Sequence, residues 1–369
     1  MDTIKTLNAL GIMSGISLDG AEFSLIKTDG IDVYKLIKSR KFLYSEDFRR
    51  QIRSLQGIDN YAQSEDFSQI NEIFTNFIID TFKEFVDDID EKIDIIGFEG
   101  HTISFCPKER KIVQLGNVQK IADETNISIV SGFSQSDILL GGRGAPLGTT
   151  YYASLASQIE KPLAFINIGG TAMITYIGAL GEMISFDCGI GNCVIDNFMR
   201  KHAGADMDYD GRCAAAGHVD EKIVQNMLRA KFLHKQPPKA FWSLSNDKSE
   251  HLEGLSIEDG AATATDFVAE ALKMQICEFL PEMPKKIIVC GGGTNNPTLL
   301  RFLRHKLPDV EIEASTAKNF DFQTTEAQAR GFIAVRRLYN MPATYPSSTG
   351  VCYPSISGTI YEPQKKSMK

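Results

Sequence analysis

The chain has 369 residues, of which 43% are hydrophobic and 23% charged, and its formal net charge is −8. This length suffices for two hydrophobic cores, so we expect two domains. The negative charge and the dispersed basic residues exclude a nucleic-acid surface as the main binding feature. The seven cysteines show no C-x-x-C spacing, which favours reduced thiols over a zinc site or a disulfide framework. No run of eighteen apolar residues occurs, and the early glycine segment leaves no room for a leader, so we expect a cytoplasmic protein without a membrane partner.

The first informative segment is GIMSGISLDG, residues 11–20, which lies between two apolar stretches. It predicts two strands joined by a turn of small residues. Backbone N–H groups and hydroxyls in such a turn can close on a phosphate, because glycine permits positive φ and close approach. The candidate phosphate-binding residues are Gly11, Ser14, Gly15, Ser17, Asp19 and Gly20. Asp19 also offers a carboxylate to a magnesium ion that accompanies the phosphate. The alternative to a phosphate-binding turn is an ordinary glycine-rich hairpin with no ligand.

The elements that follow this hairpin predict the rest of a first α/β domain. A third strand is expected over Ile31–Ser39 and a helix over Ser45–Leu55. Apolar residues at helical spacing predict a core-facing helix over Phe67–Val86. A short buried strand, Ile93–Phe98, then ends at Glu99-Gly100-His101-Thr102. The order strand, strand, strand, helix, strand indicates half of a ribonuclease-H-like domain.

The same pattern begins again near Pro162. The predicted elements are, in order, strand–glycine turn–strand over Leu163–Ile177, a third strand over Glu182–Phe186, a helix over Cys193–Lys201, an amphipathic helix over Asp259–Phe279, a strand over Lys285–Cys290, the glycine segment Gly291–Asn295 and a helix over Thr298–Lys306. We therefore expect a second domain with the fold of the first. The expected boundaries place residues 1–130 and 340–369 in the first domain and 131–339 in the second.

This duplicated layout resembles the superfamily of actin, hexokinase and Hsp70. The resemblance implies duplicated ribonuclease-H-like, actin-like ATPase domains that flank an interdomain cleft, with one hairpin of each domain on the phosphates and the late glycines against the adenosine. The implied second phosphate loop contains Asn167, Gly169, Gly170 and Thr171. The implied nucleoside loop contains Gly291, Gly292, Gly293 and Asn295. The alternative is three unrelated turns, although each directly follows an apolar strand.

Several segments resemble one family more closely, the anhydro-N-acetylmuramic acid kinases. They are Gly11–Gly20, Gln114–Gly116, Gly141–Leu147, Asn167–Thr175, Phe186–Asn192, Gly211–Val219, Pro237–Lys239, Cys290–Asn295 and Glu326–Ala327, in family order. The resemblance implies an ATP- and Mg²⁺-dependent kinase that opens 1,6-anhydro-N-acetylmuramic acid with water while phosphorylating O6, a step of peptidoglycan recycling. It also implies a homodimer.

Ring opening by water requires a general base, and Asp187 is the candidate. It follows the predicted strand Glu182–Phe186 and precedes Gly189, where the backbone can turn away from the carboxylate. The alternative is a turn aspartate that caps the next helix. Lys239 is expected either to reach a ligand or, more commonly, to be solvated. The resemblance implies a sugar-binding set of Glu326, Gly142, Arg143, His101 and Thr102.

The chain departs from the family pattern at several positions, mainly in segments that the family uses for the sugar. The departures are Glu99-Gly100-His101-Thr102 for His-Gly-Gln-Thr, Asn117 for an acid, Gly132-Phe133-Ser134 for Asp-Phe-Arg, Arg143 for glutamine and Ile16 for threonine. Two interpretations follow: an active kinase of the same or a related sugar, with His101 and Arg143 as new donors, or a non-catalytic, regulatory nucleotide-binding protein. His101 as a core histidine and Arg143 as a solvated residue are the structural alternatives.

Overall fold

The computed structural model describes residues 4–15, 18–55, 65–106, 109–241, 248–314 and 324–364. The chain forms two compact units, Met1–Leu155 with Lys318–Lys369, and Ala156–Ala317. The expected boundaries, after residue 130 and before residue 340, differ from these. The reason is packing: helix α11 (Thr325–Leu338) lies against the first sheet, and α5 (Thr149–Leu155) contacts α11.

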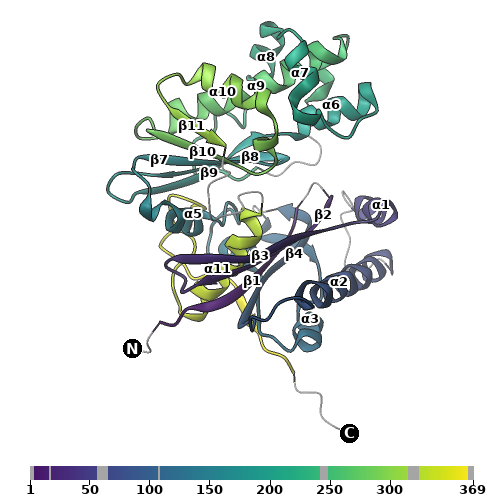
Figure 1. Ribbon diagram of the computed structural model, residues 1–369, viewed down its shortest axis with the longest axis vertical. Coiled ribbons are helices and arrows are strands. Elements are labelled where there is room, and N and C mark those ends of the chain that lie inside the picture. The colour runs from purple at the N-terminus through teal and green to yellow at the C-terminus, as the bar shows by residue number, and fades with distance from the viewer. Residues whose placement is uncertain are drawn as a thin grey trace. The chain divides into compact units, whose positions relative to one another are not determined.

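The first unit is built on a seven-stranded sheet (Figure 1). Its strands are β1 (Leu7–Ser14), β2 (Gly20–Thr28), β3 (Val33–Leu43), β4 (Ile95–Cys106), β5 (Lys111–Leu115), β6 (Ile129–Ser131) and β12 (Thr359–Tyr361). The order is β12-β6-β4-β1-β2-β3, and β5 pairs with β4. Strands β1, β2 and β3 are antiparallel neighbours, whereas β4 is parallel to β1 and β6 is parallel to β4.

Helices cover both faces of this sheet. Besides α5 and α11, they are α1 (Glu46–Leu55), α2 (Glu65–Val86), α3 (Val118–Thr125) and α4 (Phe133–Leu139). One core joins the sheet to α1, α2 and α3, and it contains Phe74, Ile78 and Phe85 of α2 at the predicted helical spacing. The core on the opposite face joins the sheet to α11 through Phe332 and Ile333. Alternate residues of one strand, such as Ala9 and Leu10, therefore belong to different cores.

The second unit repeats the central topology of the first. Its strands are β7 (Leu163–Ile168), β8 (Thr171–Ile177), β9 (Met183–Ile190), β10 (Lys286–Cys290) and β11 (Glu311–Ala314), in the order β11-β10-β7-β8-β9. Again the first three are antiparallel neighbours, and the last two are parallel to the first. The predicted duplication of a ribonuclease-H-like domain is confirmed by this strand order.

The helices of the second unit lie on one side of its sheet in Figure 1. They are α6 (Cys193–Ala203), α7 (Arg212–Ala216), α8 (Glu221–Met227), α9 (Ile257–Phe279) and α10 (Pro297–Lys306). The unit also contains short 3₁₀ turns, η3 (Ala156–Gln158), η4 (Tyr209–Gly211), η5 (Ser249–Leu252) and η6 (Gly292–Asn295). A single core joins helices α6 to α10 to the sheet. Helix α9 approaches α6 closely at Gly260, where a Cβ atom would lie 2.0 Å from the ring of Phe198.

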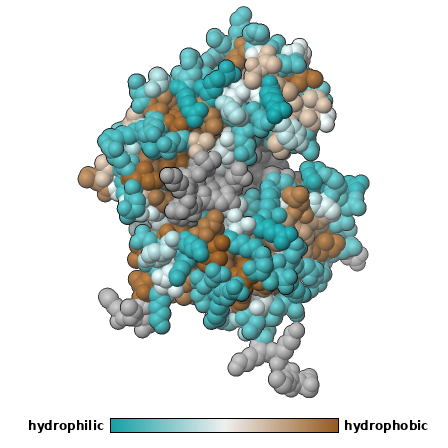
Figure 2. Space-filling model, viewed as in Figure 1, coloured by the Kyte–Doolittle hydropathy of each residue, from teal (hydrophilic) through white to brown (hydrophobic). Residues whose placement is uncertain are grey.

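The outer surface is mainly hydrophilic on the face drawn in Figure 2, with hydrophobic residues in smaller groups between the polar ones. Within the described ranges, no helix combines the length and the apolar character that crossing a membrane requires.

Candidate functional site

The predicted turn between the first two strands is present, and it joins β1 to β2. The N–H group of Leu18 donates to the carbonyl oxygen of Gly15 over 3.2 Å. Two residues of this segment, Ile16 and the candidate phosphate ligand Ser17, lie outside the described residues. Positive φ occurs at Leu18, with a value of 57°. Gly11 and Gly20 do not have positive φ. The expectation that these two positions need glycine for a positive φ is therefore wrong.

Close approach is what requires glycine at both positions. A Cβ atom on Gly11 would lie 1.7 Å from the carbonyl oxygen of Ala327 in α11, and one on Gly20 would lie 2.3 Å from that of Phe42. Gly11 thus lets α11 lie directly on β1. Because Glu326 is in the first turn of α11, this packing places the candidate sugar ligand relative to the first sheet.

Ser14 lies in a buried polar chain behind the turn. Its Oγ atom is 2.6 Å from the hydroxyl oxygen of Tyr44 and 2.9 Å from Nδ1 of His101. His101 is 0% exposed, and burial lowers its pKa to about 4, so its ring is neutral near pH 7. The structure therefore supports the core alternative for His101 rather than a direct sugar contact. Thr102, partly buried, accepts a hydrogen bond from Gln114 over 3.2 Å.

Charged side chains surround the exposed end of the turn. Lys41 of β3 lies 2.5 Å from a carboxylate oxygen of Asp19 and 3.5 Å from one of Glu22. The pKa of Glu22 is raised to about 7, mainly by burial and in smaller part by the charges of Glu326 and Asp19, although Lys41 acts to lower it. Asp19, Glu22 and Glu326 therefore share one neighbourhood. Sequence reasoning missed Glu22 and Lys41. The alternation of polar and apolar residues in their strands shows which side chains share a face, but it does not show which other groups that face meets.

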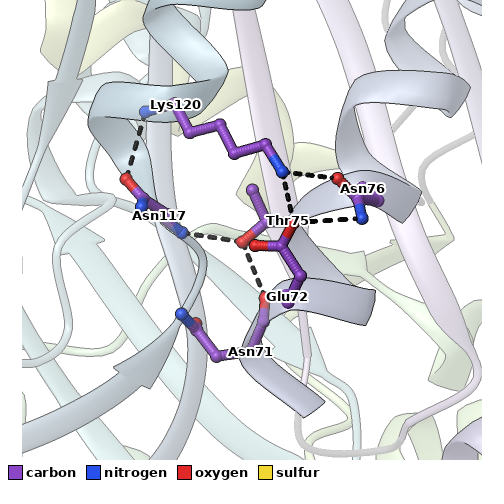
Figure 3. A network of polar contacts seen from close by, with 6 residues as sticks. All are labelled: Asn71, Glu72, Thr75, Asn76, Asn117 and Lys120. Atoms are coloured by element: carbon purple, nitrogen blue, oxygen red, sulfur yellow. Dashed lines mark hydrogen bonds and ion pairs between the residues drawn. The ribbon is translucent and has the colours of Figure 1, made fainter. Parts of the chain in front are cut away.

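Two of the departures from the family pattern have structural roles in the first unit. The carboxylate of Glu99 accepts hydrogen bonds from the N–H groups of Phe133 and Ser134, each at 2.9 Å, at the start of α4. Asn117 is the N-cap of α3: its side chain accepts from the N–H group of Lys120 over 3.0 Å. The Asn117 N–H group donates to Thr75 of α2 over 2.9 Å (Figure 3). Both residues therefore hold helices in place, a role that their sequence pattern did not indicate.

The glycine-rich loop after α4 is organised around Asp137, which is fully buried. Its carboxylate accepts from the N–H group of Gly144 over 2.7 Å and from the hydroxyl of Thr349 over 2.6 Å. A Cβ atom on Gly142 would lie 2.1 Å from this carboxylate. The N–H group of Arg143 donates to the carbonyl oxygen of Thr349 over 2.9 Å, and its side chain is partly buried. The loop that carries the candidate sugar ligands Gly142 and Arg143 is thus fixed from both sides.

In the second unit, the turn between β7 and β8 is fixed by the start of α6. The carbonyl oxygen of Gly170 accepts from the N–H groups of Gly191 and Cys193, at 2.9 and 3.2 Å, and that of Gly169 accepts from Asn192 at 2.8 Å. Gly169, Gly170 and the neighbouring Thr171 are partly exposed. The turn therefore has a defined backbone and an accessible surface, as a phosphate loop requires.

The third glycine segment lies beside this turn within the same unit. Gly291 has a φ of 74°, and a Cβ atom there would lie 2.4 Å from the side-chain oxygen of Asn167. A Cβ atom on Gly293 would lie 2.6 Å from the side chain of Ile168. Gly292 and Asn295 are exposed. Because β7 and β10 are parallel neighbours, their carboxyl ends bring the second and third predicted loops together.

Asp187 lies inside β9 rather than after it, because this strand extends to Ile190. The carboxylate is 8% exposed and accepts from the N–H group of Phe241 over 2.7 Å. Its own N–H group donates to the carbonyl oxygen of Lys239 over 3.0 Å. The alternative of a helix cap is wrong, since Asn192 occupies the N-cap of α6. Lys239 is also not solvated, because its side chain is 0% exposed.

The two sheets, each with an antiparallel three-stranded half and a glycine turn after its first strand, define a duplicated, actin-like ATPase fold. A family model described as anhydro-N-acetylmuramic acid kinase matches residues 7–363. An anhydro-N-acetylmuramic acid kinase from Acidiphilium cryptum is 35% identical over 97% of this chain and 99% of its own length. One from Paramagnetospirillum magneticum is 36% identical, over 96% and 99%. The chain belongs to the anhydro-N-acetylmuramic acid kinase family and is a sugar kinase.

Solved structures with a similar fold are more distant in sequence. Component A of (R)-2-hydroxyglutaryl-CoA dehydratase from Acidaminococcus fermentans aligns with a TM-score of 0.46 and 12% identity, over 90% of this chain and 99% of that one. A ROK family glucokinase from Streptomyces griseus, in complex with glucose and AMPPNP, aligns with a TM-score of 0.38 and 12% identity, over 89% and 99%.

Proposed function

We propose that this kinase acts on 1,6-anhydro-N-acetylmuramic acid in peptidoglycan recycling, using ATP and water. The observation that supports this proposal is the carboxylate of Asp187, buried in β9 and bound through one oxygen to the N–H group of Phe241. A carboxylate whose orientation is fixed in this way is suited to act as a general base. Its strand, β9, pairs with β8, and β8 is the strand that directly follows the second glycine turn.

In the proposed reaction, Asp187 removes a proton from water. The water oxygen forms a bond to the anomeric carbon, and the bond between that carbon and O6 breaks. O6 takes the electron pair and attacks the γ-phosphorus of ATP, and ADP leaves. The new carbon–oxygen bond thus replaces the bond to O6, and the new O6–phosphorus bond replaces the bond to ADP. The product is N-acetylmuramic acid 6-phosphate. Positioning and charge neutralisation are the main contributions that phosphoryl transfer requires from a protein.

For ATP, we propose contacts to the glycine segments of both units. The proposed residues are Gly15, Ser14, Ser17, Asp19, Asn167, Gly169, Gly170, Thr171, Gly291, Gly292, Gly293 and Asn295. Gly11 and Gly20 act instead through close backbone packing. Mg²⁺ fits the donor set near Asp19, since it prefers oxygen ligands and is held by one or two carboxylates together with substrate phosphates. Bound there, it would neutralise phosphate charge, and Lys41, now paired with Asp19, would have to share or release that carboxylate.

For the sugar, we propose contacts to Glu326, Thr102 and the loop that contains Gly142 and Arg143. The support is that this loop is held rigidly by Asp137 and that Glu326 is held by the packing of α11 on β1. His101 is proposed to act on Ser14 rather than on the sugar, because its side chain is fully buried. A homodimer and a cytoplasmic location are further proposals, supported by the family resemblance and by the composition respectively.

The experiment that tests the proposed base compares the wild type with Asp187→Asn. Asparagine keeps the shape and accepts the hydrogen bond from Phe241, but it does not take up a proton. We expect kcat to fall by about 10²–10⁴-fold, the usual contribution of a general base, with ATP affinity nearly unchanged. Steady-state kinetics and calorimetric titration with ATP measure the two quantities. Sugar phosphorylation at the wild-type rate by this variant would contradict the assignment.

A further inference from the structure

A fully buried lysine lies next to the proposed base in the second unit. Lys239 is 0% exposed, and among the contacts of the described residues its ammonium group donates to carbonyl and amide oxygens rather than to a carboxylate. Burying an ammonium group is costly unless its protons are hydrogen-bonded. A lysine retained in such a place therefore needs a compensating arrangement, and the surrounding groups provide one.

The ammonium group is held by oxygen acceptors and by aromatic faces. Its Nζ atom donates to the side-chain oxygen of Gln275 over 2.5 Å and to the carbonyl oxygen of Leu233 over 3.1 Å. The rings of Phe279, Phe232 and Phe186 have centroids 4.3, 5.2 and 5.4 Å from Nζ. Such rings attract a cation through their faces. The side chain thus connects the loop at Lys239 to α9 and to the segment after α8.

The backbone of the same residue contacts Asp187. The Lys239 carbonyl oxygen accepts from the N–H group of Asp187 over 3.0 Å, and the N–H group of Phe241, two residues on, donates to the Asp187 carboxylate over 2.7 Å. The segment 239–241 therefore holds Asp187 at both its backbone and its side chain. The ring of Phe241 also packs edge-on against Phe232, with centroids 4.8 Å apart. The position of the carboxylate depends on where this segment is anchored.

We propose that Lys239 is a positioning residue: its buried ammonium group anchors the segment 239–241, which in turn orients the carboxylate of Asp187 for proton removal from water. This inference rests on the proposed role of Asp187. It assigns to Lys239 a function in the chemical step and none in contacting ATP or the sugar. Movement of a reacting group by about 1 Å can lower the rate about a hundredfold.

The test is the variant Lys239→Met, which keeps an unbranched side chain suited to the aromatic surroundings and removes the charge and all hydrogen-bond donors. The matched control is Lys285→Met in the same unit, because Lys285 is a solvent-exposed lysine paired with Glu160. We expect Lys239→Met to lower kcat by about a hundredfold and to leave the KM for ATP within about twofold of the wild type. Lys285→Met should match the wild type in both.

A double-variant comparison separates positioning from a general structural role. If Lys239 acts through Asp187, then adding Lys239→Met to Asp187→Asn should lower kcat little further, because the group that it orients is already inactive. The inference would be overturned if the fall in kcat of the double variant equalled the product of the falls in the two single variants. An unchanged kcat in folded Lys239→Met would overturn it as well. Gln275→Met, which removes one acceptor and leaves the lysine in place, provides the same comparison if Lys239→Met does not fold. Full activity of Asp187→Asn would instead refute the proposed function itself.

Discussion

The contact between Gly11 and α11 allows the effect of one methyl group to be worked out. In Gly11→Ala, the new Cβ atom would lie 1.7 Å from the carbonyl oxygen of Ala327, whereas an ordinary carbon–oxygen contact is about 3.3 Å. The strand and the helix must therefore separate by roughly 1.5 Å. Both groups belong to backbone, so no side chain can rotate away. We expect a cost near the upper end of the usual overpacking range, about 3 kcal/mol.

The assay is thermal unfolding without ligands, followed by steady-state kinetics. For a unit of this size, about 3 kcal/mol lowers the Tm by roughly 6–12 °C. Because Glu326 precedes Ala327 in α11, its displacement should also lower kcat/KM for the sugar by up to about a hundredfold. Ser24→Ala is the control: Ser24 lies opposite Gly11 on β2, and its buried hydroxyl has no partner in the described part of the chain. Its removal should be neutral or stabilising. A Tm for Gly11→Ala equal to that of the wild type would refute the packing argument.

Two pH effects of opposite sign are expected in the first unit. The pKa of Glu22 is raised by burial from 4.5 to about 7, so the wild type should lose stability as pH rises through this window, and Glu22→Gln should remove that loss. The pKa of His101 is lowered by burial from 6.5 to about 4, so the wild type should lose stability as pH falls through that window, and His101→Gln should remove that loss. Urea midpoints at several pH values measure both, and parallel profiles of a variant and the wild type would contradict the corresponding assignment.

Much of the fold could be predicted because local sequence signals agree with tertiary packing. The apolar strand–glycine–strand pattern at residues 7–26 and again at 163–177 reports a hairpin in each unit, and the structure has β1–β2 and β7–β8 there. The helical spacing that places Phe74 and Phe85 on one face is equally local. The unit boundaries were harder to predict. Helix α11 joins the first unit through close backbone contacts at Gly11, and the hydrophobic periodicity of the sequence does not show such contacts.

The candidate site was predictable where a motif marks a loop and less so where side chains meet across the fold. Asn167 and Gly291 could be named as loop residues, but their contact at the ends of two parallel strands depends on the sheet. The surroundings of Asp187 could not be predicted, since they come from residues 239 and 241, more than fifty positions away. His101 was expected as a possible sugar contact because the sequence does not show that its ring is buried and contacts Ser14, which in turn contacts Tyr44.

The most direct test of the proposed function is the mass of the product formed from ATP, Mg²⁺ and 1,6-anhydro-N-acetylmuramic acid. The predicted product is heavier than the sugar by one phosphoryl group and one water, forms together with one ADP per sugar, and is nearly absent with Asp187→Asn. A phosphorylated sugar that retains its anhydro ring, or no product from folded protein that binds ATP, would contradict the proposal.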